Sequence, residues 1–305
     1  MKNWIILHHD VEEALRHHRP VVALESTIIT HGLPYPENLT MARNVERIVR
    51  DQGAVPATIA FLKGMIHVGL TDQQLEVLAQ EKNVEKVSRR DVSTVLSQKR
   101  SGGTTVATTM WIAHKVGIRV FATGGIGGVH RGAEQTMDIS SDLEEFTRSP
   151  IAVVSAGAKA ILDLPKTLEY LETKGVPVIG YQTKVFPAFY YSDSGIVLKS
   201  SVQSVEELAR TVAIQSHIDT STGVLVANPI PKEHALPKED VEKLIQQAIH
   251  EANEQNISGY QLTPFLLGRL KTLSHGESVE SNLALVFNNA KVASQLAVAL
   301  SKMTI

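Results

Sequence analysis

The sequence contains no cysteine among its 305 residues. Disulfide bonds, thiolate metal sites and cysteine nucleophiles are therefore excluded. Any metal ion must be bound through oxygen or imidazole ligands. The absence of cysteine is also typical of proteins from a reducing compartment.

The sequence also lacks an excess of charge of either sign and a long apolar run near its start. Its 30 basic and 32 acidic residues are spread along the chain and give a formal net charge of -2. We therefore predict no nucleic-acid partner. The apolar run at residues 4–7 ends at His8, which is too short for a signal sequence or a membrane span. We expect a cytoplasmic protein without a membrane partner.

Segments rich in valine and isoleucine alternate with amphipathic segments along the chain. This alternation predicts a mainly parallel sheet covered by helices. No polar linker, repeat or low-complexity segment interrupts it, so we predict one domain over residues 1–305. The predicted strands cover residues 21–29, 57–62, 118–123, 151–155, 176–181 and 223–227. The predicted helices cover residues 36–52, 104–116, 205–217, 241–255, 264–273 and 282–300, and one more begins at Thr71.

Ligands of open α/β sheets bind beyond the carboxyl ends of the strands, so polar residues after the apolar runs are candidates for a site. Glu25 follows Val-Val-Ala-Leu and precedes Ser-Thr-Ile-Ile, which places a carboxylate inside a segment typical of a buried strand. Burial without a paired cation would raise its pKa and suit it to proton donation. The alternative is a strand-end acid bonded to neighbouring amides or to an arginine.

Lys159 lies in the sequence Ser-Ala-Gly-Ala-Lys-Ala, directly after the apolar run at residues 151–154. Partial desolvation of a lysine in such a turn favours the neutral amine, which can attack carbon. The alternative is an ordinary solvated lysine. The small, apolar neighbours favour the functional interpretation.

Residues 137–142 place Asp138 and Asp142 four residues apart with Ser140 and Ser141 between them. All four side chains offer hard oxygen ligands, suitable for Mn²⁺ or Mg²⁺ with retained waters, or for sugar hydroxyls. A helix N-cap made by Ser140 or Ser141 is the alternative, and the spacing slightly favours it.

A glycine-rich segment at residues 123–132 follows a predicted strand and ends at His130, Arg131 and Gly132. Its glycines would let backbone amides approach an anion closely, and the two basic residues favour anion binding over a turn without a ligand. The segment is neither a dinucleotide-binding fingerprint nor a Walker loop, because the third required glycine is replaced by His130 and no Gly-Lys-Ser or Gly-Lys-Thr occurs.

Two more segments are candidates for phosphate binding. Residues 86–91 concentrate Lys86, Arg89 and Arg90, which could clamp a phosphate or form a solvated charge run. Residues 101–106 place glycines and threonines before a predicted helix whose free amides would attract phosphate, although helix capping explains the threonines equally well.

These motifs, taken together and in this order, resemble the pseudouridine-5′-phosphate glycosidase family, which is also described as indigoidine-synthase-A-like. The resemblance rests on residues 23–27 with His31-Gly32, residues 86–91, 103–106, 123–132, 137–142 and 156–159. It runs from about residue 10 to the C-terminus. It implies a three-layer α/β/α sandwich around a mainly parallel sheet, and assembly as a homotrimer.

The resemblance also implies a role for each matching position. Lys159 matches the lysine that forms a covalent adduct with ribose C1′, Glu25 matches the proton donor, and Asp138 matches the ligand of one Mn²⁺ per subunit, whose other ligands are largely water. The positions that match substrate contacts, or that line the substrate, are Lys86, Val106, Ser140, Ser141, Asp142, His130 and Asn282.

The reaction that the resemblance implies is the reversible cleavage of pseudouridine 5′-phosphate to uracil and ribose 5-phosphate. Uracil is attached through carbon, so direct departure would leave a carbanion at C5, unlike the oxygen or nitrogen leaving groups of ordinary glycosidases. An amine that adds to C1′ provides an electron sink, and a glutamate with a raised pKa can move the protons. We therefore expect a lysine-imine intermediate.

Two other functions remain open on the sequence. A Schiff-base aldolase or lyase acting on another sugar phosphate would use the same lysine and phosphate site. A non-catalytic nucleotide-binding module would use the glycine-rich segment for phosphate and the carboxylates for metal. Only the glycosidase releases uracil, and only the two enzymes form a lysine adduct.

Overall fold

The computed structural model describes residues 4–218, 221–257 and 259–303. Within these residues, 11 strands form one sheet, in which nine strands follow the order β1-β4-β3-β2-β7-β8-β11-β9-β10 while β5 and β6 join through β3. The strands are β1 (Ile5–Leu7), β2 (Val21–Leu24), β3 (Val55–Leu62), β4 (Met65–Val68), β5 (Glu85–Val87), β6 (Gly102–Thr104), β7 (Val120–Ala122), β8 (Ala152–Ser155), β9 (Val178–Tyr181), β10 (Ser200–Val202) and β11 (Val224–Ala227).

Most strand pairs are parallel, and only the pairs of β3 with β4 and of β3 with β6 are antiparallel among the described residues. The central strands β2, β7, β8 and β11 are buried along their whole length. Parallel strands covered on both faces have this near-continuous apolar character. The predicted mainly parallel α/β fold is confirmed.

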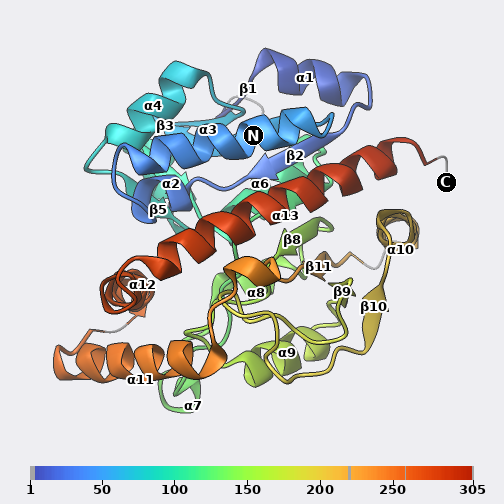
Figure 1. The fold of residues 1–305 in the computed structure, drawn as a ribbon. Helices are drawn as coiled ribbons and strands as arrows, with labels where there is room; N and C mark the ends of the chain where they lie inside the picture. Colours follow the sequence, from blue (N-terminus) through green and yellow to red (C-terminus); the bar gives the residue numbers. More distant parts are fainter. Residues whose placement is uncertain (1–3, 219–220, 258, 304–305) are drawn as a thin grey trace.

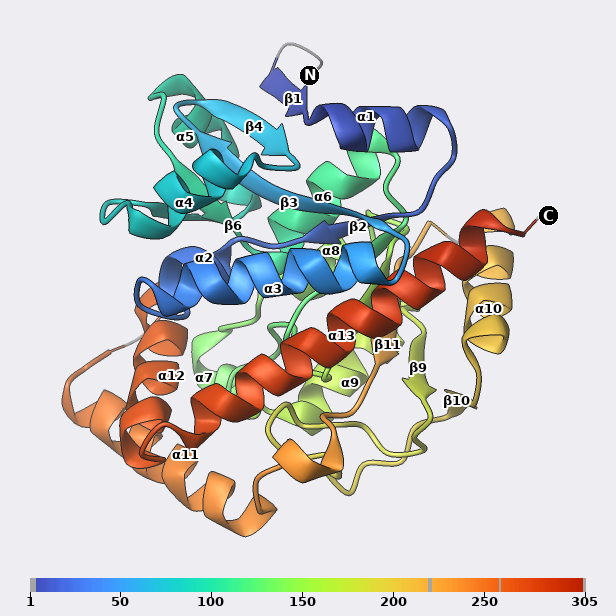
Figure 2. The same cartoon turned by 45° about the horizontal axis from the view of Figure 1, so that its top comes forward.

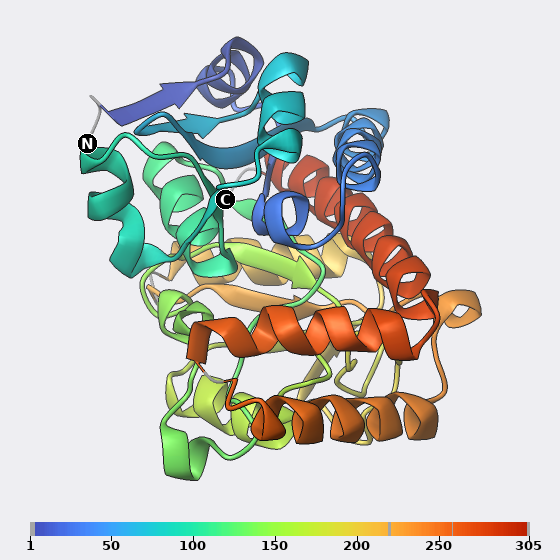
Figure 3. The same cartoon turned by 90° about the vertical axis from the view of Figure 1, so that its left-hand side faces the viewer.

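Helices cover both faces of the sheet. The longer ones are α1 (His9–Arg16), α3 (Glu37–Asp51), α4 (Asp72–Gln80), α6 (Val106–Val116), α9 (Leu164–Thr173), α10 (Val205–His217), α11 (Lys238–Glu254), α12 (Leu262–Leu273) and α13 (Glu277–Ser301), and the short ones are α2 (Thr27–His31), α5 (Val92–Ser97), α7 (Ala133–Thr136) and α8 (Ser141–Glu145). Helices α3 and α13 cross the front of the sheet in Figure 1. The side view places α6 on the opposite face (Figure 3), which gives the three layers.

The structure corrects two predicted boundaries near the carboxyl ends of the strands. The predicted strand at residues 21–29 ends at Leu24, and the chain turns at Ser26, whose carbonyl accepts bonds from the amides of Ile29 and Thr30 (both 3.0 Å) to begin α2. The predicted helix at residues 104–116 begins only at Val106, because residues 102–104 form β6. Glu25 therefore lies just beyond the end of a strand rather than inside one.

Helix α13 is the central helix of the front layer. It is long and apolar enough to cross a bilayer, yet 56% of its most apolar window is buried inside the protein. Its buried side chains include Leu285, Ala293 and Leu296, and it packs against β2, β7 and β8. The apolar character of α13 is therefore explained by its place in the core.

Candidate active site

A cavity of about 510 Å³ opens at the carboxyl ends of the central strands. Nine of the ten residues predicted for the site line it: Glu25, Lys86, Val106, His130, Asp138, Ser140, Ser141, Asp142 and Lys159. The tenth, Asn282 on α13, lines an adjoining hollow of about 80 Å³ together with Glu25, Lys86 and Lys159. Helices α2, α7 and α12 surround this end of the molecule, on the left of Figure 2. The structure thus brings the predicted residues together, while their chemical roles stay a prediction.

Strand register places Glu25 at the centre of this end of the sheet. In parallel register, Leu24 of β2 lies beside Ala122 of β7, which lies beside Val154 of β8. Glu25 follows Leu24 and Thr123 follows Ala122, so both lie at the carboxyl edge of the sheet, beside each other. The Thr123 hydroxyl donates a hydrogen bond to Oε1 of Glu25.

The pKa of Glu25 is raised, and burial of its carboxyl group is the largest cause. The positive charge of Lys159 and the Thr123 hydrogen bond both oppose the rise, and the negative charge of Asp142 adds to it. Because burial outweighs the opposing effects, this carboxyl group keeps its proton to higher pH than an exposed glutamate does. The environment of Glu25 fits a proton donor.

A tight turn after β8 positions Lys159, which is half-buried. Gly157 in this turn has φ +75°, and a Cβ atom there would lie 2.1 Å from the carbonyl oxygen of Pro187, so only glycine fits. The Lys159 amide donates to the carbonyl of Ile126 (3.1 Å), which ties the turn to the glycine-rich segment. The amine is thereby carried on a fixed backbone at the cavity wall.

Lys86, the middle residue of β5, brings a second amine into the same cavity. Its pKa is lowered, mainly by burial and then by the positive charge of Lys159. The two lysines are therefore close enough to influence each other, and the carboxylates of Asp142 and Glu25 partly offset this repulsion. Two amines and a carboxyl group with a raised pKa line one cavity.

Asp142 is fully engaged by the backbone. One carboxylate oxygen accepts the amide of Ala107 at the start of α6 (2.9 Å), and the other accepts the amide of Gly127 (2.8 Å). Ser140 caps α8 by accepting the amide of Asp142 (3.3 Å), as the capping alternative predicted. Asp142 lines the cavity, but its hydrogen bonds hold the two cavity walls together.

The glycine-rich segment allows the chain to pack closely. Several of its amides already donate hydrogen bonds within the protein, and for these amides the prediction of anion binding is wrong. The amides of Ile126 and His130 donate to the carbonyls of Gly157 (3.1 Å) and Asp138 (3.0 Å), and Gly127 donates to Asp142. A Cβ atom on Gly127 would lie 2.3 Å from Oγ of Ser140, so the segment can approach α8 only with glycine there.

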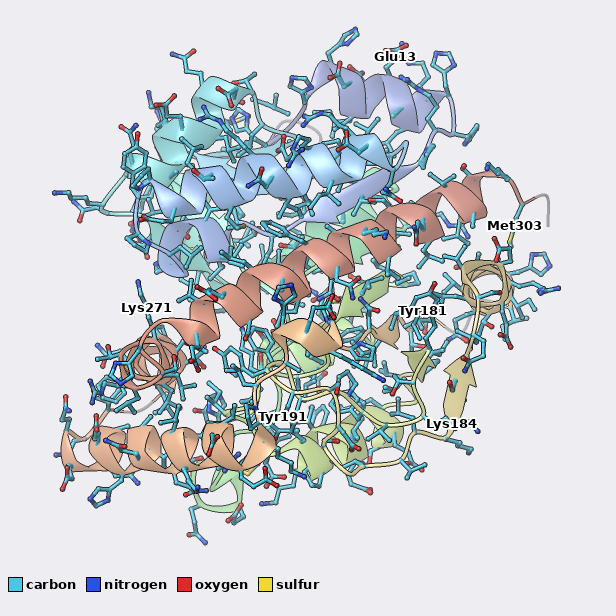
Figure 4. The ribbon with its side chains drawn as sticks, in the orientation of Figure 1. Glu13, Tyr181, Lys184, Tyr191, Lys271 and Met303 are labelled. Carbon is cyan, nitrogen blue, oxygen red and sulfur yellow. The ribbon has the colours of Figure 1, made fainter. Side chains whose placement is uncertain are left out.

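Arg131 also points away from the cavity. Its guanidinium group bonds to the carboxylate of Glu242 on α11 (3.0 Å) and to the carbonyl of Ala160 (3.1 Å). The Tyr191 hydroxyl donates to the same carboxylate (2.9 Å), and Figure 4 shows Tyr191 beside α11. The prediction that Arg131 supports anion binding is therefore wrong, because its charge is used to anchor α11.

The cationic run divides into residues inside and outside the cavity. Lys86 and Arg90 line it. Arg89 instead pairs with Glu145 (2.7 Å), whose side chain is only 1% exposed, and lies over the ring of Trp111 (5.5 Å). Of the three cations predicted as a phosphate clamp, only Lys86 and Arg90 face the space where a substrate would bind.

Asp138 and His130 form the part of the wall that could hold a metal ion. His130 is buried, and burial lowers its pKa, so its imidazole is neutral near pH 7. Its Nδ1 lies 3.9 Å from Oδ2 of Asp138. In the part of the chain that the structure describes, no three histidine, aspartate or glutamate side chains gather into a metal site. One carboxylate beside a neutral imidazole fits a hydrated divalent cation that keeps most of its waters.

Two residues that the sequence did not identify are close to the chemistry. Thr123 is buried beside Glu25, and the same rule that selected Glu25, a polar residue directly after a strand, could have found it. Thr263 reaches the cavity from α12, more than a hundred positions after Lys159, and no local pattern marks it.

Three comparisons with known proteins agree with this geometry. The family described as "Indigoidine synthase A like protein" matches residues 10–299. Proteins called pseudouridine-5′-phosphate glycosidase from Staphylococcus aureus and Geobacillus kaustophilus are 52% and 54% identical to this chain, with 99% of this chain covered in both and 99% and 100% of theirs.

Solved structures with the same fold include the prealnumycin C-glycosynthase AlnA in complex with ribulose 5-phosphate (TM-score 0.90, 38% identity, 97% of each chain). An indigoidine synthase A like protein from Thermotoga maritima aligns with TM-score 0.89 and 33% identity over 98% of this chain and 97% of its own. Because the match spans nearly the whole chain in sequence and in structure, this protein belongs to the indigoidine synthase A like family.

Proposed function

We propose that this protein is a pseudouridine-5′-phosphate glycosidase that reversibly cleaves its substrate to uracil and ribose 5-phosphate. The observation that carries the proposal is that Lys159 lines the same cavity as Glu25. The pKa of the Glu25 carboxyl group is raised. The names of relatives at 52% and 54% identity supply the substrate. The related C-glycosynthase is in complex with ribulose 5-phosphate, which supports a sugar phosphate as one half of the substrate of this protein.

The test is to incubate the protein with pseudouridine 5′-phosphate and to measure free uracil by chromatography. Uracil and ribose 5-phosphate are expected in equal amounts. An aldolase or lyase for another sugar phosphate would release no uracil, and neither would a nucleotide-binding module.

The proposed reaction begins with opening of the ribose ring. The Lys159 amine forms a bond to C1′ as the C1′–O4′ bond breaks, and Glu25 gives its proton to O4′. The nitrogen, which is an ammonium after the attack, returns a proton to Glu25, and Glu25 delivers this proton to uracil C5. The freed electron pair of the nitrogen then forms the protonated imine as the C1′–C5 bond breaks. Water adds to the imine to release ribose 5-phosphate and the free amine. The lysine nitrogen thus supplies the electron pair that expels the protonated carbon leaving group.

Asn282 is the proposed contact for the uracil ring. Its Oδ1 is buried and has no hydrogen-bond partner among the described residues. An unpaired buried acceptor is costly, and a donor from the ligand would satisfy it. The hollow around Asn282 is also lined by Phe189 and Leu267, which suit a flat ring, so we place the base here and an N–H of uracil on Oδ1.

Lys86, Arg90 and Val106 at the start of α6 are the proposed phosphate contacts. Lys86 and Arg90 supply positive charge at the cavity wall, and Val106 is the first residue of α6. A backbone amide at a helix start attracts phosphate. The next two amides of α6 already donate to Asp142 and to the Thr105 hydroxyl, so the contact is assigned to Val106. Ser141, whose hydroxyl lies 2.9 Å from that of Ser88, adds a hydroxyl at the same wall.

The neighbours Arg89 and Arg90 should respond differently to the same substitution. Arg90→Gln is expected to raise KM about tenfold, the effect of losing one partly solvated charged contact, with stability unchanged. Arg89→Gln is expected to lower the free energy of unfolding by on the order of 2 kcal/mol, because the buried Glu145 loses its cation, with KM unchanged. Steady-state kinetics and urea unfolding of both variants measure this. If the two effects were exchanged, the assignment of Arg90 to phosphate would be wrong.

We further propose that Asp138 binds one Mn²⁺ per subunit, with water as most of the other ligands. His130 is a second candidate ligand, because its imidazole is neutral near pH 7. The ion would neutralise negative charge on the bound sugar phosphate. The donors present, one carboxylate and one imidazole, fit such a weakly anchored ion.

Loss of the Asp138 carboxylate should therefore weaken metal binding. Asp138→Asn is expected to lower the affinity for Mn²⁺ by about a hundredfold, measured by calorimetry on protein stripped with a chelator. Asp193→Asn, an exposed aspartate in a loop, is the control and should bind like the unchanged protein. Equal affinity in the two variants would remove Asp138 from the metal site.

Three further properties belong to the proposal. The continuous sheet supports one domain over residues 1–305. Likeness to the family supports a homotrimer, which light scattering of the purified protein tests. The absence of cysteine and the small-molecule substrate support a cytoplasmic location.

A further inference from the structure

Thr123 is the one residue with a hydrogen bond to the side chain of Glu25 among the described contacts. It follows β7 directly, is 3% exposed, and donates its hydroxyl proton to Oε1 of Glu25. A hydroxyl that donates to one carboxyl oxygen leaves the other as the site of a transferable proton. Thr123 therefore lies where it can decide which oxygen of Glu25 carries that proton.

The backbone of Thr123 is held on both sides by hydrogen bonds, which fixes the point from which its side chain reaches Glu25. Its amide donates to the carbonyl of Val154 (3.1 Å), and its carbonyl accepts Nδ2 of Asn289 (2.8 Å). Oδ1 of Asn289 in turn accepts Nδ2 of Asn228 (2.8 Å). Asn289 and Asn228 are 0% and 4% exposed, so this polar network is buried and satisfied.

We propose that Thr123 is a positioning residue for Glu25, which fixes the orientation of its carboxyl group and keeps the proton on Oε2, facing the substrate. The inference rests on the proposed function, in which Glu25 gives its proton to the opening sugar ring. The buried pair of Asn289 and Asn228 supports Thr123 from α13 and from the end of β11. The network thus links the core helix to the proton donor.

The sign of the pH effect follows from the groups that face Glu25. Lys159, Lys86 and the Thr123 hydroxyl favour its ionised form, while burial and Asp142 favour the protonated form. Removing the hydroxyl takes away one group that favours ionisation, so the pKa of Glu25 rises further. A proton donor loses activity as pH rises through its pKa, so the limb of the profile at high pH should move to higher pH.

The experiment compares Thr123→Val, Thr123→Ser and the unchanged protein over a range of pH, with uracil release as the rate. Valine keeps the shape without the hydroxyl. Thr123→Val should lower kcat about ten- to a hundredfold at the pH optimum, with little change in KM, and its high-pH limb should move upward. Thr123→Ser should restore both kcat and the position of that limb, because the hydroxyl returns.

Thr58→Val is the matched control. The Thr58 hydroxyl donates to the carboxylate of Glu46 (2.7 Å), and both residues are buried, so this variant also removes a threonine–glutamate hydrogen bond. It should lower stability without moving the pH profile. Thermal unfolding of all variants shows that each is folded at the assay temperature.

The outcomes separate the inference from the proposed function. If the unchanged protein releases uracil and Thr123→Val has the same kcat and the same high-pH limb, Thr123 does not position Glu25. If Thr123→Val loses activity while Thr123→Ser fails to restore the limb, the threonine is merely structural and the inference is again wrong. If the unchanged protein releases no uracil, the proposed function fails first. Should Thr123→Val not fold, Thr123→Ala with the same serine comparison decides the question.

Discussion

Lys159→Ala is expected to lower uracil release by on the order of 10⁴-fold or more, because it removes the nucleophile and with it the electron pair that expels uracil. Substrate binding should stay within a few-fold of normal, since the proposed phosphate contacts at Lys86 and Arg90 remain. The rate is measured by chromatography of uracil, and the affinity by calorimetry with pseudouridine 5′-phosphate.

Lys115→Ala provides a control for the loss of a lysine. Lys115 is exposed in the last turn of α6, outside the cavity, and this variant should turn over normally. A normal rate for Lys159→Ala would mean that no covalent bond to this amine is needed. Loss of both binding and rate would instead show that Lys159 acts mainly as a charge for the substrate.

Glu25→Gln is expected to lower kcat by about 10²- to 10⁴-fold, the range for loss of a general acid. Glutamine keeps the size of the side chain and an oxygen that can accept the Thr123 bond, but it cannot give up a carboxyl proton. KM should change little. The loss of rate is measured by steady-state kinetics.

The unchanged enzyme should lose activity at high pH as Glu25 gives up its proton. Because burial raises the pKa of Glu25, the protonated form persists above the usual range for glutamate, and activity is lost only as pH rises through the raised value. Glu46→Gln is the control for Glu25→Gln. It replaces a buried glutamate that likewise accepts a threonine hydrogen bond, and it should leave kcat unchanged. An equal loss of kcat in both variants would mean that buried glutamates matter here only for stability.

The alternation of apolar and amphipathic segments was sufficient to predict the core of the fold. Helix α10 has the predicted bounds, and α3 differs from its prediction by one residue at each end. The short strands β1, β5, β6 and β10 have only three residues each, so they lack a recognisable pattern in the sequence. The end of β2 was misplaced because residues 27–29 are all β-branched and have the propensity of a strand. The bonds to the carbonyl of Ser26 instead turn the chain into α2.

The site was predictable where one rule applies, that polar residues after parallel strands meet at one edge of the sheet. This rule accounts for the meeting of Glu25 and Lys159. Residue types and spacing marked the segments at residues 86–91 and 137–142, whereas Asn282 came only from likeness to a family. The charges of Arg89 and Arg131 alone gave a misleading prediction of anion binding. Their partners in the structure are the carboxylates of Glu145 and Glu242, which lie far along the chain. No local pattern can show that an arginine is already paired.

The central claim is that the amine of Lys159 forms an imine with C1′ of the opened sugar. It is tested most directly by mixing the protein with pseudouridine 5′-phosphate, reducing with borohydride, measuring the intact mass and mapping the modified peptide. The account predicts one reduced ribose 5-phosphate unit per chain, attached at Lys159. Continued uracil release with no adduct after reduction, or an adduct mapped to Lys86, would contradict it.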